Sequence, residues 1–266
     1  MLNQIDIDDV IAIARKAGEE IMKIYTQEFD VTFKEDQSPL TLADQIAHQV
    51  ITEGLQKYQL PILSEEGRNI PFEERASWEY FWMVDPLDGT KEFIKKNGEF
   101  TVNIALIHKN TPTLGVVYAP AIDTLYYTDH TSAYKVEHGQ TTKLPISRND
   151  DKLLIVASKS HLNEETKSFI DAIETDKEKL FLSKGSSLKL CMVAEGSADL
   201  YPRLAPTMEW DTAAADAIVR KSGKKTYCYQ KEIEYSKLLS LNGCNQTLTL
   251  LQYNKRDLLN PWFIVV

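Results

Sequence analysis

The chain has 266 residues, of which 43% are hydrophobic, and its formal net charge is −9. This length permits one large domain or two closely joined halves, and the apolar content is ample for a core. The negative charge argues against general binding to a nucleic acid polymer, because such binding needs clustered Lys and Arg, but a small anion held through a metal ion stays compatible with it.

Cellular location is constrained by the cysteines and the N-terminus. Cys191, Cys228 and Cys244 are widely spaced and odd in number, which favours reduced thiols and a cytoplasmic protein. The first residues are polar and acidic, unlike a signal peptide, and no apolar run approaches the ~20 residues of a transmembrane segment. The oligomeric state and peripheral attachment to the cytoplasmic face of the inner membrane stay open.

Two amphipathic helices are predicted at the start of the chain. Apolar residues recur at helical spacing from about Asp6 to Tyr25, and again after Thr41, beyond a polar loop that ends at Pro39. Thr41 and Asp44 form a variant of the capping box, so helix capping alone explains both residues.

An apolar segment then runs into acidic residues. Pro61 to Leu63 is followed by Ser64, Glu65 and Glu66, and a solvated strand end is the simplest interpretation of this pattern. The charged stretch from Asn69 to Glu79 is expected to be a surface loop.

A buried strand is predicted over residues 81–84, ending at Asp85 and Pro86 because proline lacks the N–H that a β-ladder needs. Asp88 follows across a tight turn, and Gly89 allows a backbone conformation that a Cβ would obstruct. An ordinary Asp-rich turn would explain these residues equally well.

The same stretch also offers a set of hard oxygen ligands. The carboxylates of Asp85 and Asp88 are joined by the Leu87 carbonyl and the Thr90 hydroxyl. Two carboxylates ~4 Å apart repel by ~4 kcal/mol at an effective dielectric constant of ~20, so they ionise together only around a cation. Oxygen ligands of this kind suit Mg²⁺.

An antiparallel meander is predicted next, because residues 101–107, 114–118 and 124–127 alternate with short turns between them. Apolar residues on both faces indicate that helices cover the sheet. The polar stretch 135–151 is a plausible joint between an N-terminal half, 1–145, and a C-terminal half, 146–266, within one compact unit, although strands could also cross it.

The second half is predicted to contain strands at 153–158 and 180–182 and a helix at 164–173. Residues 185–189 open another helix; their serines are ordinary N-caps, although a helix start with hydroxyls and a Lys is also a good anion site. Asp211 suits the start of a further helix. Residues 222–266 show strand-like pieces and no evident chemistry.

Five motifs in this order resemble the inositol-monophosphatase-like superfamily of Mg²⁺-dependent, Li⁺-sensitive phosphatases: Thr-x-x-Asp at 41–44, Ser-Glu-Glu at 64–66, Asp-Pro-Leu-Asp-Gly-Thr at 85–90, Gly-Ser-Ser-x-Lys at 185–189 and Trp-Asp-x-Ala-Ala at 210–214. The Lys-Glu-Phe at 91–93 resembles the branch of 3'(2'),5'-bisphosphate nucleotidases of the CysQ type. The departures are Leu40 for Val and Ala215 for Gly. The resemblance implies an α/β fold, a layered αβαβα sandwich with mostly antiparallel sheets.

The resemblance also implies roles for individual residues. Two or three Mg²⁺ ions are expected, with ligands at Glu65, Asp85, Leu87, Asp88 and Asp211. Within this set Asp85 bridges two ions; Glu65 and the Leu87 carbonyl hold the first, and Asp88 and Asp211 the second. The catalytic residues that orient water or lie near the metal are Asp44, Thr90 and Glu66. The expected substrate contacts are Gly89, Thr90, His161, Ser186, Lys189, Arg203 and Asp211.

The implied reaction is hydrolysis of adenosine 3',5'-bisphosphate to AMP and phosphate, in support of sulfur assimilation, with its sulfated relative PAPS as a further substrate. An inositol monophosphatase or a sugar-bisphosphatase is an alternative within the same class. An aspartyl-phosphate hydrolase is another, but its Asp-x-Asp-Gly-Thr motif has one residue where two separate Asp85 from Asp88. A further alternative is a non-catalytic acidic metal-binding module, but it would not explain the presence of Lys189 and Thr90.

Overall fold

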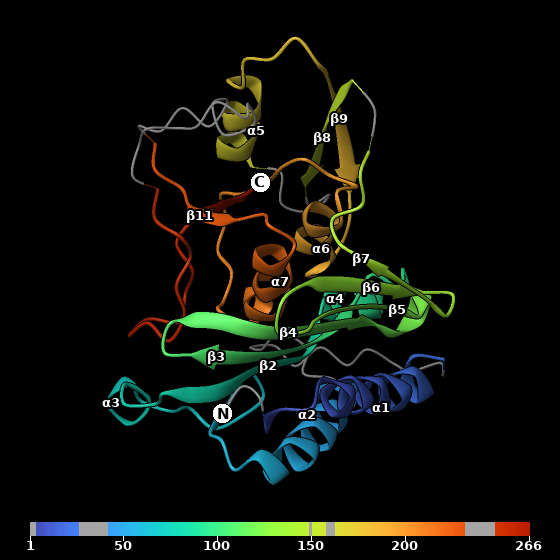
Figure 1. The fold of residues 1–266 in the computed structure, drawn as a ribbon, viewed down its shortest axis with the longest axis vertical. Coiled ribbons are helices and arrows are strands. Elements are labelled where there is room, and N and C mark those ends of the chain that lie inside the picture. Colours follow the sequence, from blue (N-terminus) through green and yellow to red (C-terminus); the bar gives the residue numbers. More distant parts are fainter. Residues whose placement is uncertain (1–3, 27–41, 149–150, 158–162, 232–247) are drawn as a thin grey trace.

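The computed structural model describes residues 4–26, 42–148, 151–157, 163–231 and 248–266. Helices and strands alternate in layers: α1 and α2 lie beneath a seven-stranded sheet, α6 and α7 lie above it, and two smaller sheets with α5 lie beyond them (Figure 1). This is the expected layered α/β sandwich with a mostly antiparallel central sheet.

The elements have the following bounds: α1 Ile7–Tyr25, α2 Leu42–Leu55, η2 Gln56–Tyr58, β1 Ile62–Ser64, α3 Phe72–Arg75, β2 Tyr80–Asp88, α4 Thr90–Ile94, β3 Thr101–His108, β4 Thr111–Ala119, η3 Pro120–Ile122, β5 Thr124–Thr128, β6 Ala133–Glu137, β7 Gln140–Lys143, β8 Lys152–Ala157, α5 Glu164–Asp171, β9 Glu178–Ser183, α6 Leu188–Glu195, β10 Tyr201–Arg203, α7 Trp210–Lys221, β11 Thr226–Cys228 and β12 Phe263–Val265. No helix in these ranges is long and apolar enough to cross a membrane.

The two N-terminal helices are confirmed. One face of α1 is buried, and the Asp6 carboxylate caps its start by accepting the N–H of Asp8 at 3.0 Å. The buried face of α2 includes Ala43, Ala47 and Ile51. Thr41 and the loop that ends at Pro39 lie outside the described residues.

The predicted meander is confirmed and extends further than expected. Strands run in the order β1 to β7, with β1 parallel to β2 and every later neighbour antiparallel. Part of the supposed joint, residues 135–143, therefore belongs to the sheet. The turn between β6 and β7 places His138 and Gly139 at φ values of 52° and 74°, a pair that closes a two-residue hairpin.

Strand β2 does not stop at Pro86 as predicted. Asp85 pairs with Asn103 and Asp88 pairs with Thr101, with an irregular register between the two pairs. The missing N–H of Pro86 is thus accommodated by a bulge within the ladder. The bulge keeps Asp85 and Asp88 on one continuous strand end.

The stretch from Asn69 to Glu79 is also not simply a surface loop. It contains α3, and Arg75 at the end of this helix is only 2% exposed. The Arg75 guanidinium donates to the side-chain oxygen of Asn254 at 2.7 Å and to the carbonyl of Arg256 at 3.0 Å. Its burial depends on a partner 179 residues away, which no local pattern reveals.

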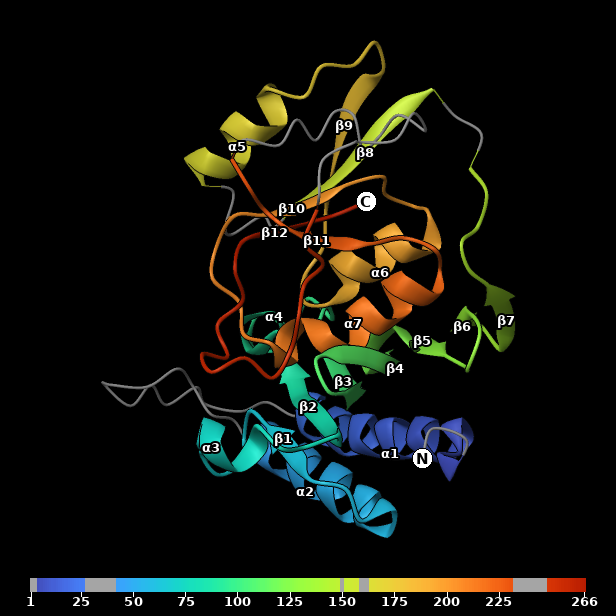
Figure 2. The ribbon, with the colours of Figure 1, turned by 60° about the vertical axis from the view of Figure 1, so that its left-hand side comes forward.

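Helix α7 lies directly on the upper face of the sheet (Figure 2). A Cβ built on Gly115 of β4 would lie 2.1 Å from the carbonyl oxygen of Ala214 and 2.9 Å from Cβ of Ala217. Glycine on the strand and alanines on the helix therefore allow the close approach. Ala215, which replaces the usual Gly, is fully buried there. This packing brings the start of α7 to the end of β2.

Candidate active site

Parallel pairing of β1 and β2 brings two acidic residues together. Ser64 is the register partner of Val84, and the N–H of Glu65 donates to the Val84 carbonyl at 3.1 Å. Glu65 therefore emerges beside Asp85, at the carboxyl ends of two neighbouring strands. A tight turn follows, in which the N–H of Gly67 donates to the Ser64 carbonyl at 3.0 Å.

A third carboxylate comes from the start of α7. One oxygen from each of Glu65, Asp85 and Asp211 lies within 4.8 Å of the others. Asp85 is 1% exposed. Glu65 is an exposed residue overall, but its carboxyl group faces the cluster. Such a set of hard oxygen donors could bind a divalent cation.

The electrostatics of this cluster fit that interpretation. Burial, and next the charge of Asp88, raise the pKa of Asp85 well above its ordinary value. The same two causes, in the same order, raise the pKa of Glu65 to about 7 and that of Asp211 to about 8. Within the described residues no Lys or Arg forms a salt bridge with these three acids. Arg203 and hydrogen bonds from the chain offset part of this repulsion, but the three pKa values stay raised, and a divalent cation would offset the rest.

Asp88 is held by a residue that the sequence did not single out. Its Oδ2 accepts the N–H of Ser187 at 2.6 Å and lies 2.9 Å from the Ser187 hydroxyl. The same hydroxyl lies 2.8 Å from the carbonyl oxygen of Asp211. Ser187 thus joins the end of β2 to the starts of α6 and α7. The only available signal was its place beside Ser186 in the Gly-Ser-Ser motif.

The sequence pattern suggested Asp211 as the N-cap of α7, and this prediction is wrong. Glu209 occupies the N-cap position, and Asp211 is the second residue of the helix. Its Oδ2 reaches back to accept the N–H of Met208 at 2.9 Å. This contact fixes the carboxylate toward the cluster.

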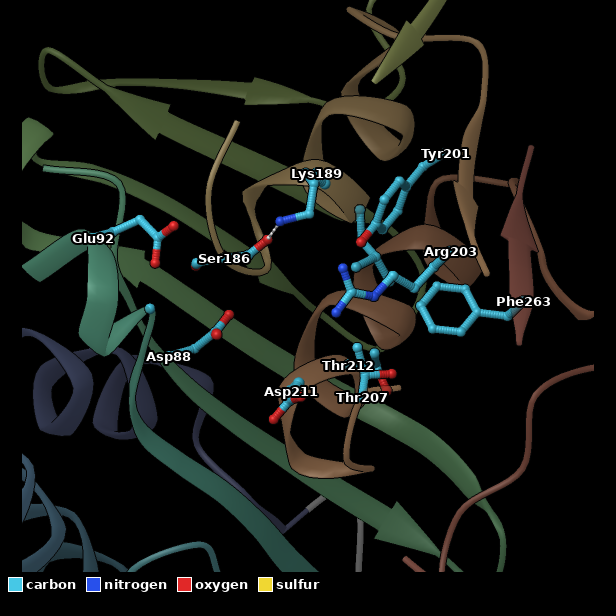
Figure 3. A pocket seen from close by; sticks show the side chains of 12 residues that line it. Asp88, Glu92, Ser186, Lys189, Tyr201, Arg203, Thr207, Asp211, Thr212 and Phe263 are labelled. Atoms are coloured by element: carbon cyan, nitrogen blue, oxygen red, sulfur yellow. Dashed lines mark hydrogen bonds between the residues drawn. The ribbon is translucent and has the colours of Figure 1, made fainter. Parts of the chain in front are cut away.

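A pocket of about 120 Å³ adjoins the acidic cluster, and Figure 3 shows its lining. Asp88 and Asp211 lie along one side, while Lys189 and Arg203 extend into the pocket from the side above them. The other lining residues are Gly89, Glu92, Ser186, Leu190, Tyr201, Thr207, Thr212 and Phe263. The pocket is therefore divided into an acidic wall and a cationic wall.

The two cationic residues differ in their surroundings. Lys189 is buried and its ammonium donates to the carbonyl of Ser186 at 2.7 Å; burial is the main cause that lowers its pKa to about 8. Arg203 is half-buried and donates to the carbonyl of Pro206 at 2.9 Å. Both were predicted substrate contacts, and both line the pocket.

Two glycines allow the walls of the pocket to approach each other. Gly89 has a φ of 94°, and a Cβ there would lie 3.2 Å from the carbonyl oxygen of Glu99. A Cβ on Gly185 would lie only 2.7 Å from the same oxygen. Ser186, whose hydroxyl lies 2.6 Å from that of Thr101, adopts a φ of 51° in the same turn.

The remaining predicted residues are placed as follows. Asp44 is buried in the first turn of α2, and its charge helps to raise the pKa of Glu65, so it lies beside the cluster. Glu66 is half-buried, and burial raises its pKa. Thr90 is the first residue of α4. His161 lies outside the described residues. The catalytic roles of Asp44, Thr90 and Glu66 stay predictions.

The sequence pattern missed the contribution of the C-terminal region. Phe263 of β12 lines the pocket, and its ring meets that of Tyr201 edge to face, with centroids 5.9 Å apart. The continuous apolar run at 263–265 indicates a buried strand at best, because the pocket forms only once β12 pairs with β10.

Comparison with known proteins gives a consistent result. The model of the inositol monophosphatase family matches residues 4–257. The 3'(2'),5'-bisphosphate nucleotidase CysQ of Escherichia coli K12 is 46% identical over 235 residues, which are 86% of this chain and 94% of that protein. The protein of the same name from Haemophilus influenzae is 35% identical over 271 residues, covering 100% of this chain and 94% of its own length.

Solved structures show the same similarity. CysQ from Bacteroides thetaiotaomicron, described as a bacterial member of the inositol monophosphatase family, has a TM-score of 0.84 and 43% identity, covering 97% of this chain and 95% of its own. The extragenic suppressor protein suhB from Bartonella henselae shares the fold, with a TM-score of 0.68 and 24% identity over 87% of this chain and 91% of its own.

Proposed function

The chain belongs to the inositol monophosphatase family, and on this basis we propose that it is a 3'(2'),5'-bisphosphate nucleotidase. The proposed reaction removes the 3'-phosphate of adenosine 3',5'-bisphosphate to give AMP and phosphate, with PAPS as a further substrate. The names of the relatives that share at least 35% identity over most of the chain support this reaction.

The observation that carries the choice of substrate is the division of charge in the pocket. Lys189 and Arg203 extend from the side opposite Asp88 and Asp211. A substrate with two phosphates would satisfy both walls: one phosphate through cations at the acidic side, the other through direct contact with the cationic side. An inositol monophosphate has no second phosphate for Lys189 and Arg203.

The metal we propose is Mg²⁺, in two or three ions. The residues that would hold it are Glu65, Asp85, the Leu87 carbonyl, Asp88 and Asp211. Their all-oxygen donor set and the raised pKa values of three of them fit this group. When bound, Mg²⁺ supplies neutralisation of phosphoryl oxygens, acidification of water and stabilisation of the departing oxygen.

The chain itself would position the reactants. Asp44 and Thr90 are proposed to orient the attacking water, with Glu66 close to it. The N–H groups of Gly89 and Thr90, at the start of α4, would hold the reacting phosphate. No side chain is needed as a covalent nucleophile.

The other end of the substrate would be held by the cationic wall. Ser186, Lys189 and Arg203 are proposed to contact the ribose and the second phosphate, and His161 is a further predicted contact. The edge-to-face rings of Tyr201 and Phe263 give this end an apolar surface. We place the activity in the cytoplasm and in sulfur assimilation; the free, buried thiol of Cys191 supports a reducing compartment.

Phosphate release from adenosine 3',5'-bisphosphate, 3'-AMP and inositol 1-phosphate tests the proposal, each with Mg²⁺ and then with added Li⁺. We expect the bisphosphate to have the highest kcat/KM, by about 10–100-fold over 3'-AMP, since one charged contact pair contributes about 1.5–3 kcal/mol. Li⁺ should inhibit the reaction. Equal or faster hydrolysis of inositol 1-phosphate would show that the protein is an inositol monophosphatase instead.

A further inference from the structure

Glu209, the residue before the Trp-Asp motif, is a buried carboxylate with 0% exposure. Its Oε2 accepts the N–H of Asn254 at 2.5 Å. Its Oε1 accepts the N–H of Lys255 at 3.0 Å and the ammonium of the same residue at 2.5 Å. The carboxylate therefore fastens the chain near the C-terminus to the start of α7, and Lys255 balances its charge.

The segment 254–260 also holds the main chain just before α7, beside which it passes (Figure 2). The N–H of Glu209 donates to the Leu258 carbonyl at 2.9 Å, and the Asn260 amide donates to the Met208 carbonyl at 2.8 Å. Met208 in turn donates its N–H to the Asp211 carboxylate at 2.9 Å. The Thr207–Met208 peptide group, which supplies this N–H, is held as well, because the N–H of Asn260 donates to the Thr207 carbonyl at 2.8 Å. Segment 254–260 therefore holds two consecutive peptide groups just before α7.

A third anchor comes from α3. Asn254 has a left-handed φ of 61°, and its side-chain amide forms two hydrogen bonds with Arg75: one to the guanidinium at 2.7 Å and one to the carbonyl at 2.9 Å. Because Arg75 is itself buried, Asn254 presents its N–H to Glu209 from a fixed position. The contacts form a continuous buried chain from Arg75 through Asn254 and Glu209 to the helix that carries Asp211.

We infer that Glu209 is a positioning residue for Asp211: it fixes the start of α7 against segment 254–260 so that the Asp211 carboxylate faces Glu65 and Asp85. The inference deepens the metal site of the proposed function and rests on it. Residues behind metal ligands typically change metal affinity or activity by about 10–100-fold when replaced. Glu209 lies behind the proposed ligand Asp211 in this way. Its negative charge does not add to that of the acidic cluster without compensation, because Lys255 pairs with it.

The test compares Glu209→Gln with Asp216→Asn by calorimetric titration with Mg²⁺. Asp216 is a matched control: it is also 0% exposed, lies on α7 and pairs with a cation, Arg220, at 2.8 Å. In E209Q one oxygen becomes an NH₂ that faces an N–H donor, so we expect Kd for Mg²⁺ to rise about tenfold. D216N should change the Kd for Mg²⁺ less than twofold, even if its melting temperature falls as much as that of E209Q.

Kinetics give a second measurement. At limiting Mg²⁺ the E209Q enzyme should lose most of its activity, and saturating Mg²⁺ should restore most of kcat, whereas a general loss of folded protein would not be restored in this way. Lys255→Met removes the ammonium group but keeps both main-chain N–H donors to Glu209, and it should raise Kd for Mg²⁺ several-fold. This variant provides the test if E209Q fails to fold. Unchanged Kd in K255M, or equal changes in E209Q and D216N, would overturn the inference. Wild-type protein that binds Mg²⁺ but hydrolyses no nucleotide would instead contradict the proposed function and leave this comparison valid.

Discussion

Ser187 and Asp88 are 99 residues apart in the chain, yet the N–H and the hydroxyl of Ser187 lie 2.6 and 2.9 Å from one oxygen of Asp88. The contact fixes the Asp88 carboxylate from the start of α6, and the same hydroxyl reaches the Asp211 carbonyl. Two proposed metal ligands on different elements therefore depend on one serine.

Replacement of this serine should weaken metal binding. In Ser187→Ala the main-chain donor to Asp88 stays, while the hydroxyl contacts with Asp88 and Asp211 are lost. A hydrogen bond to a charged group contributes about 1.5–3 kcal/mol, so we expect the Mg²⁺ concentration for half-maximal activity to rise about tenfold. A titration of activity with Mg²⁺ measures this.

Ser186→Ala is the matched control for S187A. The Ser186 hydroxyl contacts Thr101 and lines the pocket, without a contact to Asp88. S186A should raise KM for adenosine 3',5'-bisphosphate and leave the Mg²⁺ requirement unchanged. The same Mg²⁺ shift in both variants would argue against a separate role for Ser187.

Asp85→Asn should separate stability from activity. Asn keeps the oxygen that accepts the Leu87 N–H at 3.1 Å but removes a buried charge that its neighbours repel. We expect a folded protein that has lost activity by several orders of magnitude. In EDTA its melting temperature should equal or exceed that of the wild type, and Mg²⁺ should no longer raise it. Retained turnover would rule out the bridging role of Asp85.

Stability without metal should fall as the pH rises. The pKa values of Glu65 and Asp211 are raised in the folded protein to about 7 and about 8, so the folded state binds more protons than the unfolded state over this range. Their favourable contribution is complete below the unfolded values near pH 4 and is lost as the pH rises through 7 to 8. Thermal unfolding in EDTA between pH 5 and pH 8.5 should show this decline, at about 2–4 °C per kcal/mol.

Saturating Mg²⁺ should reverse that trend, because metal binding displaces the protons and favours the ionised ligands. The stabilisation by Mg²⁺ is therefore expected to grow with pH over the same interval. A melting temperature in EDTA that stays constant from pH 5 to pH 8.5 would show that these carboxyl groups do not repel one another as described.

Lys189→Met should impair the binding of the second phosphate. Burial lowers the Lys189 pKa to about 8, so the folded state disfavours its charge and the variant should be at least as stable as the wild type at pH 7. Loss of a charged contact should raise KM for adenosine 3',5'-bisphosphate about 10–100-fold, with little change for 3'-AMP.

The pH dependence of KM offers an independent check of this role. With saturating Mg²⁺, KM of the wild type for the bisphosphate should rise above about pH 8 as Lys189 loses its proton, and K189M should lack this rise. A KM increase of equal size for 3'-AMP in K189M would place Lys189 at the reacting phosphate instead.

Local patterns predicted most of the fold. The helical spacing in α1 and α2 and the alternation in β3, β4 and β5 correspond to the observed elements. Two departures from the local pattern share a cause. Strand β2 continues past Pro86 because β3 supplies a partner for Asp88, and β6 and β7 form in a polar stretch because they extend an existing sheet. Pairing with a neighbour outweighed local composition in both cases.

The sequence by itself determined the chemical groups of the candidate site, because the acidic residues, the glycines and the Gly-Ser-Ser-x-Lys string stand in short motifs with a recognisable order. Only the tertiary structure decided how these groups meet. Parallel pairing of β1 with β2 sets Glu65 beside Asp85, and the packing of α7 on the sheet brings Asp211 to them. The roles of Ser187, Arg75 and segment 254–260 were hidden for the same physical reason: their partners are distant in the chain, and hydrogen bonds between distant residues leave no periodicity in a sequence.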